Sequence, residues 1–236
     1  MPASIVISGL HFAWPDGAVL FDDLNAAVGA GRSGLVGVNG SGKSTLLRLI
    51  TGDLVPGRGS VRHTGRLAYL PQDITLDGAR RVDEVLGIAD IRAALRAIDR
   101  GQVTEATLTA VGDRWDAEEQ ALATIERLGL AAIGLDRTVR EISGGEAVLL
   151  ALAARLLRRP DVLLLDEPTN NLDLRARRRL FDILHRPEGR GFPRSPVGFP
   201  ASSGRAFTAC AGRVLPSLPR RFTSPQALRR GCCGPR

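Results

Sequence analysis

The chain has 236 residues, of which 32 are Lys or Arg and 25 are Asp or Glu, and its isoelectric point is near 10.7. Apolar residues make up 44%, enough to bury a normal core, which excludes a wholly disordered chain. The charge is uneven: residues 1–186 hold 23 basic and 24 acidic residues (net −1), whereas residues 187–236 hold nine arginines and one acid (net +8). The basicity, which would otherwise favour a nucleic-acid or anionic partner, therefore belongs to the last fifth of the chain.

Residues 1–186 contain no cysteine, which excludes a disulfide framework or a cysteine zinc site in that segment. The N-terminus lacks the basic and then apolar pattern of a signal peptide. The longest uncharged apolar run, Ala147–Ala154, is far too short for a membrane span. These features predict a cytoplasmic location.

The elements expected first, in chain order, are strands at Ile5–Leu10, Leu24–Val28 and Gly34–Val38, a helix over Lys43–Thr51, and short strands around Val61 and over Leu67–Leu70. From about Thr75 to Glu141 the sequence is rich in Ala and Leu and has charged residues at periodic positions, which predicts several helices. The clearest of these are Asp90–Asp99 and Trp115–Leu128.

A helix over Glu146–Leu157, a buried strand over Val162–Leu165 and a basic amphipathic helix over Leu174–His185 are expected to follow. The order of strands and helices indicates an α/β protein with a mostly parallel sheet and an inserted helical subdomain.

A glycine-rich turn between an expected strand and an expected helix matches the pattern G-x-x-x-x-G-K-[ST]. Its backbone N–H groups and the start of the helix would together hold phosphates. The residues expected to bind are Gly37, Asn39, Gly40, Ser41, Gly42, Lys43, Ser44 and Thr45. Lys43, the chain's only lysine, would reach the β- and γ-phosphates, and the Ser44 hydroxyl would ligate Mg²⁺.

Two carboxylates end the expected strand Val162–Leu165. Asp166 would face Mg²⁺ and Glu167 the attacking water, since adjacent side chains on a strand diverge. An ordinary solvated strand end is the alternative, but the phosphate-binding turn favours the functional interpretation.

Ser143-Gly144-Gly145-Glu146 opens the helix over Glu146–Leu157. Two interpretations fit it equally well. One is a second anion site made by free backbone N–H groups and the helix dipole. The other is a capping box with Ser143 as N-cap and Glu146 three residues later.

Over residues 4–186 these motifs occur in the order in which they occur in the ATP-binding cassette (ABC) ATPases, and the chain resembles that family. The resemblance implies a P-loop NTPase fold, the ABC nucleotide-binding domain, with a helical subdomain at about residues 75–145, and it implies ATP and Mg²⁺ as ligands. It makes Gly37–Thr45 the Walker A loop and Glu167 the catalytic carboxylate after Walker B. It also makes Gln72 the Q-loop residue, which senses the γ-phosphate and ligates the metal together with Ser44 and Asp166.

The resemblance further identifies Ile142–Glu146 with the LSGGQ signature, whose Ser143, Gly144 and Gly145 would contact ATP held by a second cassette. Asp173 falls in the D-loop, and Trp14 falls where an aromatic stacks on adenine. Core packing or simple exposure is the alternative for Trp14. Because cassettes hydrolyse ATP in head-to-tail pairs, the expected partner is another cassette, from a second copy or another protein.

Within the family the chain looks most like the first cassette of an ABC-F protein, a soluble class of which several members act on the ribosome. Glu146 in the signature and the run Glu167–Asp173 support this interpretation, although Asn171 stands where His is usual. The alternative is an ATP-binding subunit that serves a membrane transporter.

Two family features are missing after the helix Leu174–His185: an apolar strand, which in the family lies between the Walker A and Walker B strands, and the Ser-His-Asp that follows it. Residues 1–186 therefore predict a partial domain with a gap in its sheet, incomplete on its C-terminal side. A nucleotide-binding remnant without turnover is a further alternative. For residues 187–236, rich in Arg, Pro and Gly, an out-of-frame translation, a disordered RNA-binding tail and a divergent C-terminus all remain open, and the gene's other reading frames would decide.

Overall fold

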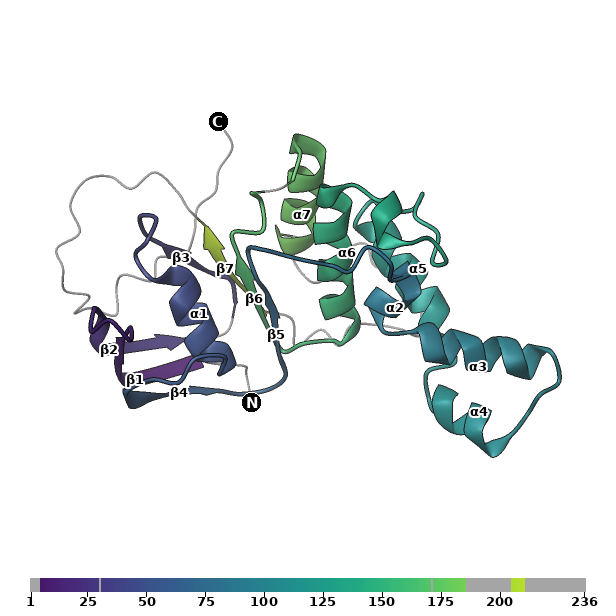
Figure 1. Cartoon of the computed structure of the whole chain (residues 1–236), viewed down its shortest axis with the longest axis horizontal. Coiled ribbons are helices and arrows are strands. Elements are labelled where there is room, and N and C mark those ends of the chain that lie inside the picture. The colour runs from purple at the N-terminus through teal and green to yellow at the C-terminus, as the bar shows by residue number, and fades with distance from the viewer. Residues whose placement is uncertain (1–4, 30, 171, 186–204, 211–236) are drawn as a thin grey trace. The chain divides into compact units, whose positions relative to one another are not determined.

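A computed structural model of the chain describes residues 5–29, 31–170, 172–185 and 205–210. By their contacts the residues fall into two compact units. The first comprises residues 1–72, 160–168 and 199–236, and the second comprises residues 73–159 and 169–198. Figure 1 shows the elements along the chain.

The first unit contains a three-stranded antiparallel sheet in the order β2-β1-β4. Its strands are β1 (Ile5–Ala13), β2 (Val19–Val28) and β4 (Arg58–His63). Burial alternates along β1, so that Ile5, Ile7, Leu10 and Phe12 face the core. At the β1–β4 contact Gly59 has φ +81°, and a side chain there would collide with the backbone carbonyl of Gly9, so close strand approach requires glycine.

The same unit contains a four-stranded parallel sheet in the order β3-β7-β6-β5. Its strands are β3 (Ser33–Val36), β5 (Leu67–Leu70), β6 (Val162–Asp166) and β7 (Arg205–Cys210). All five residues of β6 are buried, as the continuous apolar run Val162–Leu165 predicts for a strand covered on both faces.

The expectation of a gap in this sheet is wrong. β7 lies between β3 and β6 and is parallel to both, with Leu35 opposite Ala209 and Leu164 opposite Phe207. The pairing supplies partners for backbone groups that a gap would leave unpaired. The rest of the segment 187–236 lies outside the described residues, so the interpretations offered for it stay untested.

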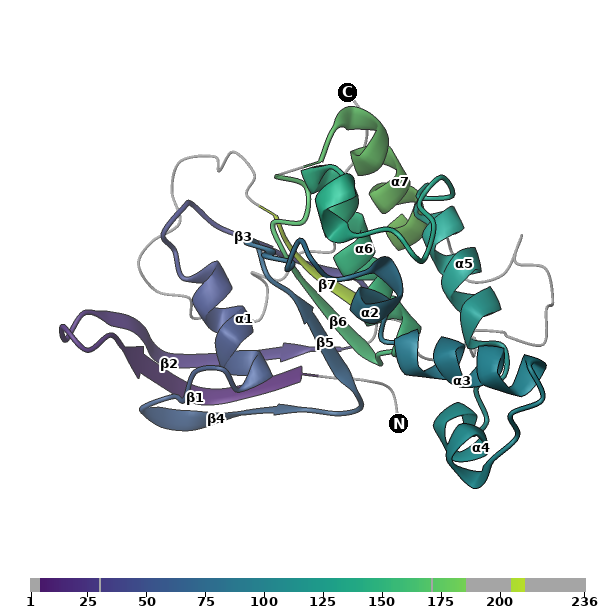
Figure 2. The same ribbon diagram turned by 45° about the vertical axis from the view of Figure 1, so that its right-hand side comes forward.

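Helix α1 (Lys43–Thr51) packs on the three-stranded sheet and on β6, as Figure 2 shows from one side. Leu46, Leu47, Leu49 and Ile50 of α1 join the inward side chains of β1 and β6 in one apolar cluster. Gly42 and Gly52, both in the left-handed backbone conformation, flank the helix. This packing fixes the helix start, and with it the glycine-rich turn, against the sheet.

The second unit is helical. Its elements are α2 (Val82–Leu86), α3 (Ala89–Asp99), α4 (Glu105–Val111), α5 (Ala117–Arg127), the short 3₁₀ helix η1 (Val139–Glu141), α6 (Gly144–Leu157) and α7 (Leu174–His185). Helix α6 packs against α2 and α5, and α3 packs against α4. Seven consecutive residues of α6, Val148–Ala154, are buried, so α6 forms the centre of this unit.

The predicted helices over Lys43–Thr51 and Leu174–His185 and the strand over Leu67–Leu70 are confirmed at both ends. Both β1 and β2 are longer than predicted, and they belong to the antiparallel sheet, so the parallel arrangement covers only four of the described strands. Within the described part of the chain, none of the helices combines the length and the apolar character that crossing a membrane requires.

Candidate functional site

The glycine-rich turn connects β3 to α1 in the first unit, as its sequence predicts. Gly42 has φ +89°, and a Cβ there would lie 2.9 Å from Leu20 Cδ2. A Cβ on Gly37 would lie 2.5 Å from Ser41 Oγ. The turn therefore has no room for a side chain at either glycine. The α1 N-terminus adds the positive end of its dipole to the loop.

Lys43 is the first residue of α1, and it is nearly buried, with 7% of its surface exposed. Its Nζ donates to the carbonyl oxygens of Gly37 (3.1 Å) and Val38 (3.2 Å), both within the loop. The same nitrogen lies 3.7 Å from Glu167 Oε1. The loop thus holds its one cation at a fixed point, where it can attract an anion.

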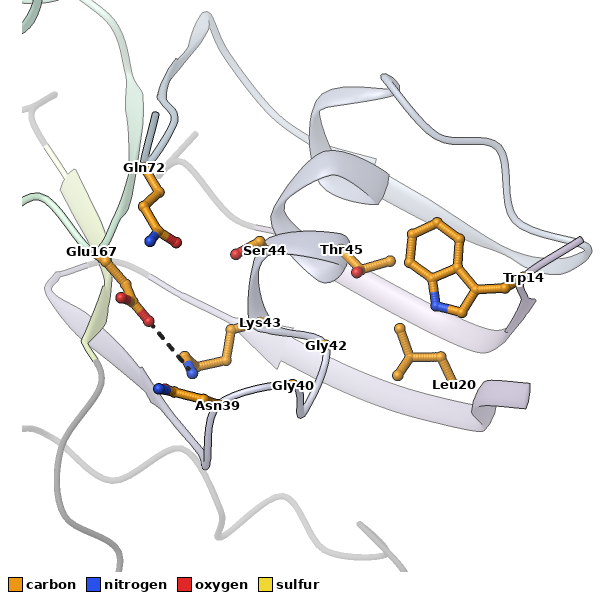
Figure 3. A pocket seen from close by; sticks show the side chains of 10 residues that line it. All are labelled: Trp14, Leu20, Asn39, Gly40, Gly42, Lys43, Ser44, Thr45, Gln72 and Glu167. Carbon is orange, nitrogen blue, oxygen red and sulfur yellow. Dashed lines mark ion pairs between the residues drawn. The ribbon is translucent and has the colours of Figure 1, made fainter. Parts of the chain in front are cut away.

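The two carboxylates at the end of β6 have different surroundings. Asp166 is the last residue of the strand and is 1% exposed. Glu167 follows with φ +44°, a left-handed conformation that is uncommon for a residue with a side chain. This backbone turn sends the Glu167 side chain toward Lys43, as Figure 3 shows. Glu167 therefore lies beyond the strand, and its direction comes from this backbone turn and not from strand alternation. The separate roles of the two carboxylates stay a prediction.

Asp166 has a partner that sequence reasoning missed. Tyr69 on β5 donates its hydroxyl hydrogen to Asp166 Oδ2, at 3.1 Å. The other oxygen, Oδ1, is buried and has no hydrogen-bond partner among the described residues. Burial, and after it the Asp166 charge, raise the pKa of Tyr69 above its usual value, so the phenol stays protonated and able to donate.

A pocket of about 440 Å³ opens beside the turn. Its lining residues are Trp14, Leu20, Asn39, Gly40, Gly42, Lys43, Ser44, Thr45, Gln72 and Glu167. Figure 3 shows Trp14 and Leu20 at one end, and Glu167, Gln72 and Lys43 at the other. Nine of the ten are predicted site residues; Leu20 was missed, since nothing in its sequence context distinguishes it from a core leucine of β2.

Trp14 is neither core nor simply exposed. It lies between β1 and β2, 37% of its surface is exposed, and it lines the pocket. Its ring meets Phe12 edge to face, with centroids 5.1 Å apart at 84°. The contact with Phe12 supports the indole, and its position in the pocket lining lets it stack on a ligand.

The signature-like residues Ser143, Gly144 and Gly145 belong to the second unit, at the start of α6. The capping box is present: Ser143 N donates to Glu146 Oε2 (2.7 Å), and Glu146 N donates to Ser143 Oγ (3.3 Å). The hydrogen bond that the Ser143 backbone N–H donates to the Glu146 carboxylate, and after it one from the Ser143 side chain, hold the pKa of Glu146 below its usual value. The capping interpretation is confirmed, while anion binding at this helix start stays a prediction.

Asp173, the predicted D-loop residue, also belongs to the second unit. Its Oδ1 accepts a hydrogen bond from Ala176 N at 2.7 Å, so it caps the start of α7. Asn171, two residues before it in the predicted D-loop, lies outside the described residues.

The donor set of the first unit fits a nucleoside triphosphate with its metal. The loop supplies one cation and a helix start for phosphates. The Ser44 hydroxyl lines the pocket, and the buried Asp166 Oδ1 has an unused acceptor; both are oxygen ligands of the kind that Mg²⁺ prefers. Trp14 offers an aromatic surface at the far end.

Comparison with known proteins also indicates an ATP-binding protein. The ABC transporter family matches residues 21–170. The chain is 37% identical over 185 residues to the tylosin resistance ATP-binding protein TlrC of Streptomyces fradiae, covering 68% of this chain and 34% of that protein. It is 36% identical over 191 residues to the cobalt import ATP-binding protein CbiO of Rhodobacter capsulatus, covering 78% and 66%.

The energy-dependent translational throttle protein EttA of Haemophilus influenzae is 35% identical over 177 residues, covering 67% of this chain and 32% of EttA. The chain therefore spans about a third of TlrC and of EttA. Among solved structures, a bacterial Atm1-family ABC exporter with ATP bound matches with a TM-score of 0.64 at 20% identity, over 89% of this chain and 35% of the exporter. That likeness supports the fold.

Proposed function

Since the chain belongs to the ABC transporter family of ATP-binding domains, we propose that the pocket beside α1 is its Mg·ATP site, with Trp14 stacked on the adenine and Lys43 on the β- and γ-phosphates. The observation that carries this proposal is the pocket itself. Its lining combines an aromatic ring, the glycine-rich turn with its lysine, and the polar side chains of Gln72 and Glu167.

In this proposal Ser44, Asp166 and Gln72 hold Mg²⁺, which when bound neutralises charge on the phosphate oxygens. Glu167 accepts a hydrogen bond from the attacking water and polarises it. Lys43 is held by two backbone carbonyls and by Glu167, so a phosphate would take over a cation already oriented toward the loop.

The signature residues and Asp173 serve a second cassette in this proposal. Ser143, Gly144 and Gly145 would contact ATP held by the partner, because cassettes act as head-to-tail pairs. The partner is a second copy of this chain or another cassette protein.

The finer proposal is an ABC-F-like soluble cassette with a ribosome as target. Glu146 in the signature supports it, as does the similarity to EttA, which is named a translational throttle. The similarity to CbiO, which is named a cobalt import protein, favours the alternative of a subunit that docks on a transporter's membrane protein. Co-purification with ribosomes or with a membrane protein would separate the two.

The central test is ATP binding by the full chain and by Lys43→Ala, measured by isothermal titration calorimetry with Mg²⁺ present. We expect Lys43→Ala to weaken binding by about a hundredfold, because hydrogen-bonded charge pairs contribute about 1.5–3 kcal/mol. Arg48→Ala, which removes a cation from the last turn of the same helix, is the matched control. Equal ATP affinity of parent and Lys43→Ala would refute the assignment.

A further inference from the structure

The hydrogen bond between Tyr69 and Asp166 joins β5 to the end of β6 beneath the proposed metal site. We propose that Tyr69 is a positioning residue for the metal: its hydroxyl holds Asp166 Oδ2, so that Oδ1 is the oxygen presented to Mg²⁺. This inference rests on the proposed Mg·ATP site, because it assigns a task to Tyr69 only if Asp166 is a metal ligand.

The strand register brings the two side chains together. In the parallel pair of β5 and β6, Tyr69 lies opposite Leu164. Leu164 and Asp166 are two residues apart, so they share one face of the sheet, and Tyr69 shares that face with them. A tyrosine side chain is long enough to reach a residue on the neighbouring strand that lies two positions beyond the one directly opposite. The hydroxyl thus reaches the strand end, while the ring packs against the apolar cluster of the first unit.

The two oxygens of Asp166 are differently occupied. Oδ2 accepts the Tyr69 hydrogen bond at 3.1 Å, and Oδ1 is buried with no hydrogen-bond partner among the described residues. A buried carboxylate oxygen without a partner is costly, and a bound cation would relieve that cost. Fixing one oxygen also fixes the rotation of the carboxylate, so the other oxygen has a defined direction.

The ring and the hydroxyl of Tyr69 can be tested separately. Tyr69→Phe keeps the ring that packs on the apolar cluster and removes only the donor. A merely structural role would lower the stability of the first unit without changing how ATP binding depends on Mg²⁺. A positioning role would change that dependence.

The test is ATP binding to the full chain by calorimetry at increasing Mg²⁺ concentrations, and again with EDTA. For Tyr69→Phe we expect unchanged ATP affinity in EDTA and an increase of about tenfold in the Mg²⁺ concentration for half-maximal effect, the usual loss when an outer-shell partner of a metal ligand is removed. Ser60→Ala on β4, which removes a hydroxyl elsewhere in the same unit, is the control. An unchanged or lower Mg²⁺ requirement overturns the proposal.

Asp166→Asn separates this inference from the proposed function. If Asp166→Asn abolishes the Mg²⁺ dependence and Tyr69→Phe leaves it at the parent value, only the positioning role fails. If the parent and Asp166→Asn respond alike to Mg²⁺, the metal site itself is wrong and both fail. In the Asp166→Asn background, Tyr69→Phe should cause no further change.

A spectroscopic measurement tests the proposal even if the Tyr69→Phe variant fails to fold. Tyr69 is the chain's only tyrosine, so protein made with ¹³Cζ-labelled tyrosine gives one resonance that responds to the bond at the hydroxyl. We expect this resonance to move on Asp166→Asn and on adding Mg·ATP to the parent, and to stay in place with ATP in EDTA. A resonance insensitive to both changes overturns the proposal.

Discussion

The ammonium group of Lys43 has negatively polarised or charged partners within the protein. Two loop carbonyls and the Glu167 carboxylate surround it, and the side chains of both residues are largely buried, 6% exposed for Lys43 and 13% for Glu167. Any anion entering the turn must therefore compete with Glu167 for the same cation. The catalytic carboxylate of the proposed site thus limits the affinity for the nucleotide that it would help to hydrolyse.

From this competition we expect Glu167→Gln to bind ATP more tightly than the parent by about fivefold, which corresponds to about 1 kcal/mol. The substitution removes the charge near Lys43 and its repulsion of the γ-phosphate, and it removes any turnover. Calorimetry measures the affinity, and sedimentation with ATP detects a trapped closed dimer. Glu126→Gln on α5 changes the net charge equally, far along the chain; weaker binding by Glu167→Gln would contradict the competition.

Two glycines of the turn allow the stability cost of a left-handed backbone to be measured separately from the cost of steric crowding. Gly40 and Gly42 both have positive φ, +80° and +89°, but a Cβ at Gly40 would meet nothing within 4 Å, whereas at Gly42 it would press on Leu20 and Phe21. We expect Gly40→Ala to lower the free energy of unfolding by about 1 kcal/mol through the left-handed conformation alone. Gly42→Ala should cost about 1–3 kcal/mol more through crowding.

Urea unfolding of the two variants measures this difference, and ATP calorimetry shows whether displacement of Leu20, a pocket residue, also weakens binding. Equal losses of stability would mean that the side chains of β2 adjust freely and that crowding has no part in the choice of glycine.

At the scale of elements, one arginine links three helices of the second unit, α2, α3 and α5. Arg92 on α3 is 3% exposed and donates to Asp83 of α2 (2.6 Å), Glu118 of α5 (3.1 Å) and Asp136 (3.1 Å). We call these four residues the Arg92 cluster. Hydrogen bonds from Arg92, and its charge, hold the pKa of Asp136 below its usual value, with Arg96 contributing as well.

The lowered pKa fixes the sign of a pH effect. Asp136 binds fewer protons in the folded than in the unfolded chain, so it stabilises the fold above its ordinary pKa of about 3.9, and the contribution is lost as pH falls through the lower folded value. We expect Asp136→Asn to cost about 0.5–1 kcal/mol at pH 7, since this side chain is 61% exposed. As the pH falls below the lowered folded-state pKa of Asp136, the difference from the parent should vanish.

Thermal unfolding at a series of pH values measures the difference, with Asp113→Asn as a control for an exposed carboxylate outside the Arg92 cluster. A destabilisation that stays constant down to pH 2 would show that the Asp136 side chain acts by packing and not by its charge.

The sequence predicts best those features that depend on neighbouring residues in the chain, and predicts poorly those that depend on pairing between distant segments. Helix α1 and the loop before it have a strict motif and a glycine at each end, so both were predicted residue by residue. The strand β7, Arg-Ala-Phe-Thr-Ala-Cys, has few β-branched residues and no alternation. Its place depends on pairing with β3 and β6 on both sides, a non-local interaction that a sequence pattern does not contain. The hydrogen bond of Tyr69 to Asp166 depends on register in the same way.

At the scale of the whole molecule, the distribution of histidines bears on catalysis. His11 lies on β1, paired with Asp22 at 3.1 Å, and His63 ends β4. Neither is among the pocket residues. His185 is the last residue of α7, and residues 211–236, which follow β7, contain no histidine. β7 lies between β3 and β6, which is the place where the resemblance expects the strand before Ser-His-Asp, and no histidine follows it in residues 211–236.

For this reason we expect the purified 236-residue chain to bind Mg·ATP without sustained hydrolysis, because the histidine that would contact the γ-phosphate while Glu167 polarises the water is missing. Phosphate release over many turnovers and calorimetric binding, measured on one preparation, test this together. Glu167→Gln sets the background, so that traces of a foreign ATPase are recognised. Turnover that exceeds this background would show that another group replaces the histidine, and the chain would then be an active ATPase. Binding with release at the background level would mark it as a nucleotide-binding module.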